Sequence, residues 1–141
     1  MFVLDTNALS AIMGSQPVPE VAARVAAQPE ALLFTSAVCQ AEILAGIAIL
    51  PDGRRRRALE AAARAIFAED FDGRILPFDQ TAAGFYAELF AAREQAGRPT
   101  ATADLMIAAV ALANGANMVT RNISDFEGCG LTLINPWVEP P

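Results

Sequence analysis

The sequence of 141 residues contains no histidine and no lysine. Without histidine, the chain has no imidazole base, no histidine metal ligand and no serine–histidine catalytic pair. All ten basic residues are arginine, so chemistry that employs lysine is excluded as well. The two cysteines, Cys39 and Cys129, are too few and too far apart for a zinc cluster. They are expected to be free thiols in a reducing compartment.

Long hydrophobic runs and positive charge are also scarce. The longest apolar stretch, residues 32–50, is interrupted by Ser36, Gln40 and Glu42, which favours a buried strand and helix over a membrane span. The N-terminus lacks the basic flank and cleavage region of a signal peptide. We therefore expect a cytoplasmic protein with no membrane partner. The net charge of −6 argues against broad electrostatic binding of nucleic acid, but it is compatible with a local basic patch.

The composition, 54% hydrophobic and 18% charged, is typical of a globular chain, and the length suits a single domain over residues 1–141. Short apolar runs bounded by turn residues alternate with longer helical segments. The expected strands cover residues 1–4, 32–35, 74–78, 117–120 and 131–134. The expected helices cover residues 8–13, 20–27, 37–50, 52–69, 81–95 and 105–113. This alternation predicts an α/β fold with a parallel sheet of four to five strands flanked by helices.

Asp5 directly follows the first apolar run and precedes a predicted helix. Ligands of open α/β sheets bind beyond the carboxyl ends of such strands, which would place Asp5 in a cleft. In that arrangement Thr6 or Asn7 would cap the helix. The alternative is that Asp5 itself caps the helix, which is a common use of aspartate after a strand.

Two further carboxylates lie in apolar helices. Glu42 lies in the second turn of the helix predicted from residue 37, where burial would be costly without a partner. It could instead lie at the rim of that helix with its carboxylate in water. Asp104 begins the helix predicted over 105–113, which is apolar on all sides and therefore buried. The only role of Asp104 could be a favourable interaction with the helix dipole. The small neighbours Ala101 and Ala103, however, leave room for a substrate and favour a functional role.

A fourth candidate group follows the predicted strand 117–120. Asn122 and Asp125 are three residues apart and share a face if this segment forms a helical turn. Asp125 brings charge to a bound cation, whereas Asn122 offers only a carbonyl oxygen or a hydrogen bond to bound water. The alternative for Asp125 is a cap of the turn before Phe126.

Together these side chains predict an acidic site at one edge of the sheet. Two carboxylates about 4 Å apart repel each other by about 4 kcal/mol at an effective dielectric constant of 20, so a cluster needs protons or a cation. With oxygen ligands alone, the fitting cation is Mg²⁺ or Mn²⁺. Such sites bind substrate phosphates and activate water.

Four motifs in order carry a resemblance to a known family. They are Leu4-Asp5-Thr6-Asn7, Ala41-Glu42, Thr102-Ala103-Asp104, and Thr120-Arg121-Asn122 with Asp125-Phe126. They resemble the motifs of PIN domains, and within these the VapC-type toxins of bacterial toxin–antitoxin pairs. The segments Arg74-Ile75-Leu76-Pro77-Phe78-Asp79 and Asn135-Pro136-Trp137 are similar to the FitB branch of that family.

The resemblance implies a Mg²⁺-dependent ribonuclease that is inhibited by a small DNA-binding antitoxin, whose tail wraps the toxin. Asp5, Glu42 and Asp104 would form the catalytic site, with Asp5 and Asp104 holding the metal ion. This chain departs from the family at the fourth position, where Asn122 follows Thr-Arg in place of an aspartate, and Asp125 would take that role. The substrate-binding residues implied are Thr6, Asn7, Thr120 and Asn122. A homodimer is also expected, with a higher toxin–antitoxin assembly on DNA through the antitoxin.

Two other classes of protein compete with this interpretation. Haloacid dehalogenase phosphatases and response-regulator receivers also begin with a strand that ends in aspartate, but the first need a second aspartate where Asn7 stands, and both usually employ a lysine. The stronger alternative is a catalytically weak PIN-like module that only binds partners in a DNA-bound complex with its antitoxin. Asn122 motivates this alternative, because it weakens the fourth ligand position.

Two surface features are each compatible with more than one interpretation. The run Arg54–Arg57 opens a predicted helix, where positive charge opposes the helix dipole, so it does not stabilise that helix. The run could contact a phosphate or an acidic partner, or form a solvated face with Glu60 as a partner. The helix predicted over 81–95 carries an aromatic stripe around Phe85 and Tyr86, which is typical of a core face or a subunit interface.

Overall fold

A five-stranded parallel sheet forms the centre of the chain. The structure is a computed structural model that describes residues 1–141. The strand order is β3-β2-β1-β4-β5, and each neighbouring pair is parallel. The strands are β1 (Phe2–Leu4), β2 (Leu33–Ser36), β3 (Ile75–Leu76), β4 (Asn117–Val119) and β5 (Leu133–Ile134). This confirms the predicted α/β class and parallel sheet, because helical crossovers join strands that run the same way.

Helices connect successive strands, and most begin or end within a few residues of the predicted boundaries. They are α1 (Thr6–Ile12), α2 (Pro19–Ala26), α3 (Ala37–Ala48), α4 (Arg54–Ala65), α5 (Gln80–Gln95), α6 (Thr102–Ala113) and α7 (Ile123–Phe126). A 3₁₀ turn, η1 (Glu30–Leu32), precedes β2, and α4 ends in a π-helical turn, η2 (Ile66–Asp70). The helix predicted over 52–69 therefore begins at Arg54, and its last turn is a wider π-helical turn.

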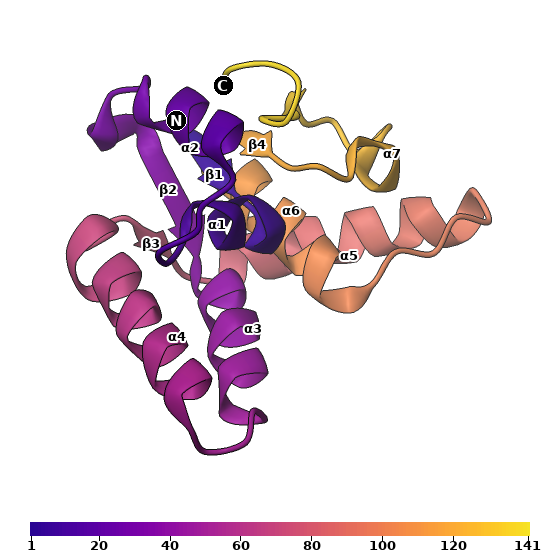
Figure 1. Cartoon of the computed structure of the whole chain (residues 1–141). Coiled ribbons are helices and arrows are strands. Elements are labelled where there is room, and N and C mark those ends of the chain that lie inside the picture. Colours follow the sequence, from indigo (N-terminus) through magenta and orange to yellow (C-terminus); the bar gives the residue numbers. More distant parts are fainter.

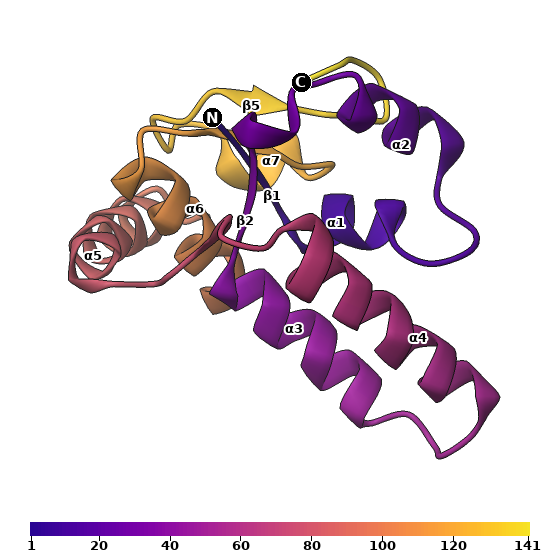
Figure 2. The same cartoon turned by 90° about the vertical axis from the view of Figure 1, so that its left-hand side faces the viewer.

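The helices are distributed around the sheet in three groups (Figures 1 and 2). Figure 2 shows α1 and α2 on one side of the strands and α5 and α6 on the other. The antiparallel pair α3 and α4 projects from the carboxyl ends of the strands, because β2 runs directly into α3 (Figure 1). None of the helices is both long and apolar enough to cross a membrane.

The core is one continuous cluster of buried side chains around β1, β4 and α6. Val3 and Leu4 of β1 are fully buried, as expected for a central parallel strand with helices on both faces. In α6, the run from Ile107 to Ala111 is fully buried, which confirms the prediction that this helix is enclosed. Gly115 ends α6 with a φ of 62°, a left-handed conformation that glycine adopts without strain. A single core agrees with a single domain.

Helix caps at the carboxyl ends of the strands correct one detail of the prediction. Asp5, not Thr6 or Asn7, is the N-cap of α1, and its side chain accepts a hydrogen bond from the Ala8 N–H. Aspartate suits this position because an N-cap residue keeps an extended backbone, from which its short side chain can accept an N–H of the first turn. Ser36 caps α3 in the same way. Two polar residues are thus fixed at the same edge of the sheet.

Candidate acidic active site

Asp5 lies at the end of the central strand and is held in one orientation by its neighbours. One carboxylate oxygen, Oδ1, accepts the Ala8 N–H at 2.8 Å, and the other, Oδ2, accepts the Thr120 hydroxyl at 2.6 Å. The side chain is 4% exposed, and its burial raises the pKa of Asp5 above the ordinary value. Both hydrogen bonds oppose this rise in pKa, and the negative charge of Asp104 adds to it. The structure therefore confirms that Asp5 caps α1, and its role in ligand binding stays a prediction.

Thr120 links Asp5 to the segment that follows β4. This residue is fully buried at the end of the strand adjacent to β1. Its hydroxyl donates to Asp5 and accepts the backbone N–H of Asn122 at 3.0 Å. The structure shows Thr120 as a residue that positions Asp5, and its contact with substrate stays a prediction.

Glu42 is an exposed residue on α3, at the rim of that helix, with its carboxylate bonded to α1. The Thr6 hydroxyl donates a hydrogen bond of 2.5 Å to Glu42 Oε1, which leaves Oε2 without a partner in the chain. Asn7, the third residue of the opening motif, is exposed on the first turn of α1. Thr6 therefore holds a carboxylate, and substrate binding by Thr6 and Asn7 stays a prediction.

Asp104 lies in the first turn of α6. It is partly buried, and this burial raises its pKa above the ordinary value, with further contributions from the charges of Glu42 and Asp125. Because Asp5 also responds to the charge of Asp104, the structure brings all four predicted carboxylates within electrostatic range through Asp104. A cation at this position would relieve their mutual repulsion.

Asp125 lies on α7 and is exposed. Its backbone carbonyl accepts a bond from the Thr100 hydroxyl, but its carboxylate has no hydrogen-bond partner in the chain. The side chain is therefore not the cap of this turn in the structure. The negative charge of Asp125 contributes to the raised pKa of Asp104, and its role as a metal ligand stays a prediction.

The chemistry of these donors suits a hard divalent cation, because all of them are oxygen atoms. Their spacing is open, however, and no three side chains of the cysteine, aspartate or glutamate type lie close enough together to hold a metal ion. Glu42 is turned toward Thr6, and the carboxylates repel one another in the absence of a counter-ion. The predicted carboxylates are therefore separated groups that interact electrostatically but do not form a closed metal cluster.

Two residues outside the predicted site, one in β2 and one in α3, lie close to Asp5 and support its position. The buried Thr35 hydroxyl donates to the carbonyl of Leu4, the residue before Asp5. Cys39 is buried and close enough to Asp5 that the aspartate charge adds to the rise in its pKa, which burial dominates. Thr35 lies near the end of β2 and Cys39 in the first turn of α3, and both are close to Asp5 because β2 is adjacent to β1 in the sheet.

Two arginine side chains fix the position of α7. Arg93 of α5 is only 7% exposed, and it donates from Nε to the Thr100 hydroxyl at 2.9 Å and from an amino nitrogen to the Glu127 carbonyl at 3.2 Å. Arg98 donates to the Ser124 carbonyl. The signal in the sequence was an arginine beside the buried face of α5, but its partners are distant along the chain.

The fold and the site together define a small α/β domain with a histidine-free acidic site at the carboxyl edge of its parallel sheet. The PIN domain family matches residues 2–127. The chain belongs to this family, and within it to the group of the VapC and FitB toxins.

Three relatives are similar to the chain over 97% of its length. It is 41% identical to plasmid stability protein StbB of Pseudomonas syringae pv. tomato, covering 99% of that protein. It is 39% identical to VapC ribonuclease Y4jK of Sinorhizobium fredii, covering 98% of it, and 32% identical to toxin FitB of Neisseria gonorrhoeae, covering 99%. These full-length matches confirm the resemblance read from the four motifs.

Two solved structures show the same fold. One is FitAB bound to an IR36 DNA fragment, with a TM-score of 0.87 at 32% identity over 97% of this chain and 96% of that chain. The other is FitAcB from Neisseria gonorrhoeae, with a TM-score of 0.86 at 32% identity over 97% and 99% of the two chains. The predicted similarity to the FitB branch is thus supported by structure as well as by sequence.

Proposed function

We propose that the protein is a divalent-metal-dependent ribonuclease and the toxin of a toxin–antitoxin pair. The observation that carries this proposal is the pair Asp5 and Asp104, two carboxylates with raised pKa at the sheet edge and no basic side chain bonded to either. The 39% identity with a VapC ribonuclease supports the reaction class. RNA and the antitoxin would be met in the cytoplasm.

Each residue of the site has a distinct task in this proposal. Asp5 and Asp104 would hold the cation, Mg²⁺ or Mn²⁺. When bound, it would lower the pKa of a water molecule and offset charge at the scissile phosphate. The Thr120 hydroxyl and the Ala8 N–H keep the Asp5 carboxylate in one orientation. Glu42, with Oε2 free, would accept a proton from water next to Asp104.

The test is incubation of pure, antitoxin-free protein with total RNA, with Mg²⁺ and with excess EDTA. We expect Mg²⁺-dependent cleavage in the parent protein and none in Asp5→Asn or Asp104→Asn. Circular dichroism and thermal unfolding should show that both variants keep the fold. Full activity in EDTA, or in the Asp5→Asn protein, would contradict the proposal.

The proposed protein partner is a cognate antitoxin that inhibits the site and carries the complex onto DNA. Its support is the similarity to the FitAB structure bound to DNA. We also propose a homodimer, because α5 presents the half-exposed Phe90 at the surface, stacked on Tyr86, which packs partly against the core. Co-purification of the two proteins encoded together, followed by sedimentation, tests both assemblies.

A second candidate function is a catalytically weak module that acts through its partners in the DNA-bound complex. Asn122 favours it, because an amide stands where an aspartate would add charge to the metal site. The open spacing of the carboxylates also favours it. Absence of Mg²⁺ binding by the isolated protein, together with retained antitoxin binding, would select this function.

A further inference from the structure

The arginine run at the start of α4 contains one paired and three unpaired residues. Arg56 donates from Nε to Glu60 at 2.8 Å, and it also reaches the Leu50 carbonyl and Asp52. The predicted partnership with Glu60 is therefore confirmed for Arg56 alone. Arg54, Arg55 and Arg57 are exposed and have no partner in the chain. Their charges oppose the dipole of α4, so their placement is not explained by helix stability.

A groove connects this run with the acidic site. Its cavity of about 310 Å³ lies between α1, α3 and the start of α4. Thr6 and Glu42, the hydrogen-bonded pair of the site, line it together with Ser10 and Gly46. Arg55 is the one basic residue in its wall. The groove therefore combines the Glu42 carboxylate, two hydroxyl side chains and the free cation of Arg55 in one surface. Five apolar side chains complete its lining: Met13, Ile43, Ile47, Leu50 and Leu59.

We propose that this groove binds the RNA strand beside the scissile phosphodiester, with Arg55 contacting a flanking phosphate. The inference rests on the proposed ribonuclease function and assigns the path of its substrate. The acidic site and a net charge of −6 repel RNA, so substrate binding requires local cations near the site. Arginine supplies a planar, permanently charged donor that matches phosphate oxygens in pairs.

Arg55 is the one residue of the arginine run that lines the groove, and Arg57, two residues further on, faces nearly the opposite side of α4. The hydroxyl of Ser10 in the groove can donate to or accept from a ribose 2′-hydroxyl, the group that distinguishes RNA from DNA. Arg55 is accordingly a substrate-binding residue, outside the set predicted from the motifs.

The first test measures binding of a labelled single-stranded oligoribonucleotide of mixed sequence by fluorescence anisotropy. The protein is the antitoxin-free Asp5→Asn chain, which prevents turnover, and affinity is recorded over a range of salt concentrations. Loss of one phosphate contact in Arg55→Gln should weaken binding and reduce the slope of log affinity against log salt by about 0.7. An unchanged slope and affinity in Arg55→Gln would overturn the proposal.

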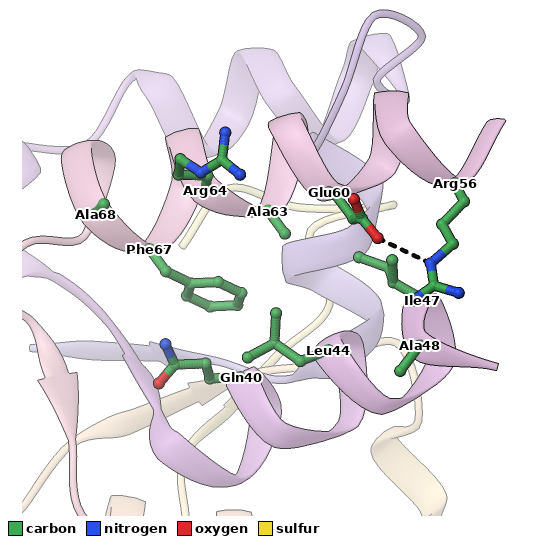
Figure 3. A pocket seen from close by; sticks show the side chains of 10 residues that line it. All are labelled: Gln40, Leu44, Ile47, Ala48, Arg56, Glu60, Ala63, Arg64, Phe67 and Ala68. Atoms are coloured by element: carbon green, nitrogen blue, oxygen red, sulfur yellow. Dashed lines mark hydrogen bonds and ion pairs between the residues drawn. The ribbon is translucent and has the colours of Figure 1, made fainter. Parts of the chain in front are cut away.

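Arg64→Gln is the matched control. Arg64 is an exposed, unpaired arginine on the same helix, but it lines a different cavity of about 370 Å³ between α3 and α4 (Figure 3). Figure 3 shows this cavity between the Phe67, Leu44 and Ile47 side chains, with the Arg56–Glu60 pair at its margin. The control variant should keep the RNA affinity and salt slope of the parent. An equal loss in both variants would indicate a general charge effect and would overturn the groove assignment.

A second variant tests the groove without changing charge. A Cβ built on Gly46 meets no atom within 4 Å, so a larger side chain fits on α3 without a clash in the protein. Gly46→Gln should place its side chain in the groove and weaken RNA binding, whereas Gly46→Ala should bind like the parent. Equal affinity of the two variants would show that RNA does not occupy the groove.

The outcomes separate this inference from the proposed function. Mg²⁺-dependent cleavage by the parent with normal RNA binding by Arg55→Gln would remove the groove proposal alone. No cleavage and no RNA binding by the parent would remove both proposals. If Arg55→Gln keeps RNA binding but loses binding of the cognate antitoxin, the groove belongs to the protein partner and the proposal is wrong.

Discussion

At the scale of single residues, Asp5 shows how one carboxylate serves structure and chemistry together. Its two oxygens accept hydrogen bonds from opposite sides, one from the start of α1 and one from the end of β4. Each carboxylate oxygen has two lone pairs, so one acceptor position on each remains for a cation or water. Capping therefore does not compete with the proposed metal binding, and the same contacts orient the ligand.

The pKa of Asp104 leads to a prediction about pH and stability. Its folded pKa lies above the ordinary value of 3.8, so the folded chain binds more protons than the unfolded chain between these two values. The free energy of unfolding should therefore fall as pH rises through this window. Asp104→Asn should remove the contribution of Asp104 to this fall in the free energy of unfolding, because the asparagine side chain does not titrate.

Thermal unfolding of the parent and of Asp104→Asn between pH 4 and 7, in EDTA, measures the difference. The parent should lose more stability than the variant as the pH rises. Added Mg²⁺ should restore the parent at pH 7 and leave the variant nearly unchanged, because a ligand stabilises only the state that binds it. Parallel pH profiles of the two proteins would contradict the prediction.

The fourth ligand position supports a second prediction at this scale. Asp125 is exposed, unbonded and within electrostatic range of Asp104, so Asp125→Asn should weaken Mg²⁺ or Mn²⁺ binding. The loss should be smaller than that in Asp5→Asn or Asp104→Asn. Asn122→Asp should strengthen binding, because it adds charge to the same corner. Isothermal titration calorimetry measures the metal affinity of each variant. Metal binding and RNA cleavage by Asp125→Asn that match the parent would exclude Asp125 from the site.

At the scale of elements, α7 depends on contacts from the end of α5 and the loop that follows it. This four-residue helix has no side-chain cap of its own, and Arg93, Arg98 and Thr100 hold its backbone carbonyls and those next to it. An isolated turn this short is not stable in water. The position of Asp125 is therefore set by the end of α5 and the loop that follows it.

Arg93→Met tests this dependence. Methionine keeps an apolar stem in the same space but removes the two hydrogen bonds that Arg93 donates, so we expect a loss of about 1–3 kcal/mol in the free energy of unfolding. Hydrogen exchange should accelerate in residues 122–129. Arg24→Met serves as a control, because Arg24 bonds the carbonyl of Pro136 and supports the C-terminal tail instead. Unchanged exchange in residues 122–129 would contradict the prediction.

At the scale of the whole molecule, α5 offers a surface for self-association. Tyr86 packs edge-on against Phe78 and stacks on Phe90, which is 47% exposed. Such exposed aromatic side chains often contribute strongly to protein interfaces, and a stable interface buries about 1,600 Å² in total.

Phe90→Ser should therefore weaken the proposed homodimer at least tenfold. Sedimentation velocity over a range of micromolar concentrations measures the shift toward monomer. Ile49→Ser is the control, since Ile49 is 85% exposed but lies at the end of α3, on the projecting helix pair. A parent protein that remains monomeric throughout would refute the dimer, and equal weakening by both substitutions would place the interface elsewhere.

The sequence alone determined the class of fold and the identity of the acidic residues. Apolar runs such as residues 2–4 and the all-apolar α6 encode their burial locally, because side-chain periodicity follows directly from strand and helix geometry. The order of the four motifs was sufficient to predict the family, and PIN domain membership confirms it. The side chains of Ser36 and Asp79 cap α3 and α5, which also follows from a local preference of serine and aspartate for this position.

Only the tertiary structure decided how these residues meet. Thr120 and Asp5 are 115 positions apart, and their hydrogen bond exists because β4 lies beside β1. The same packing turned Glu42 toward Thr6, placed Arg93 against α7 and brought Arg55 into a groove shared with the site. Contacts between distant segments depend on strand order and helix packing, which no local pattern in the chain specifies.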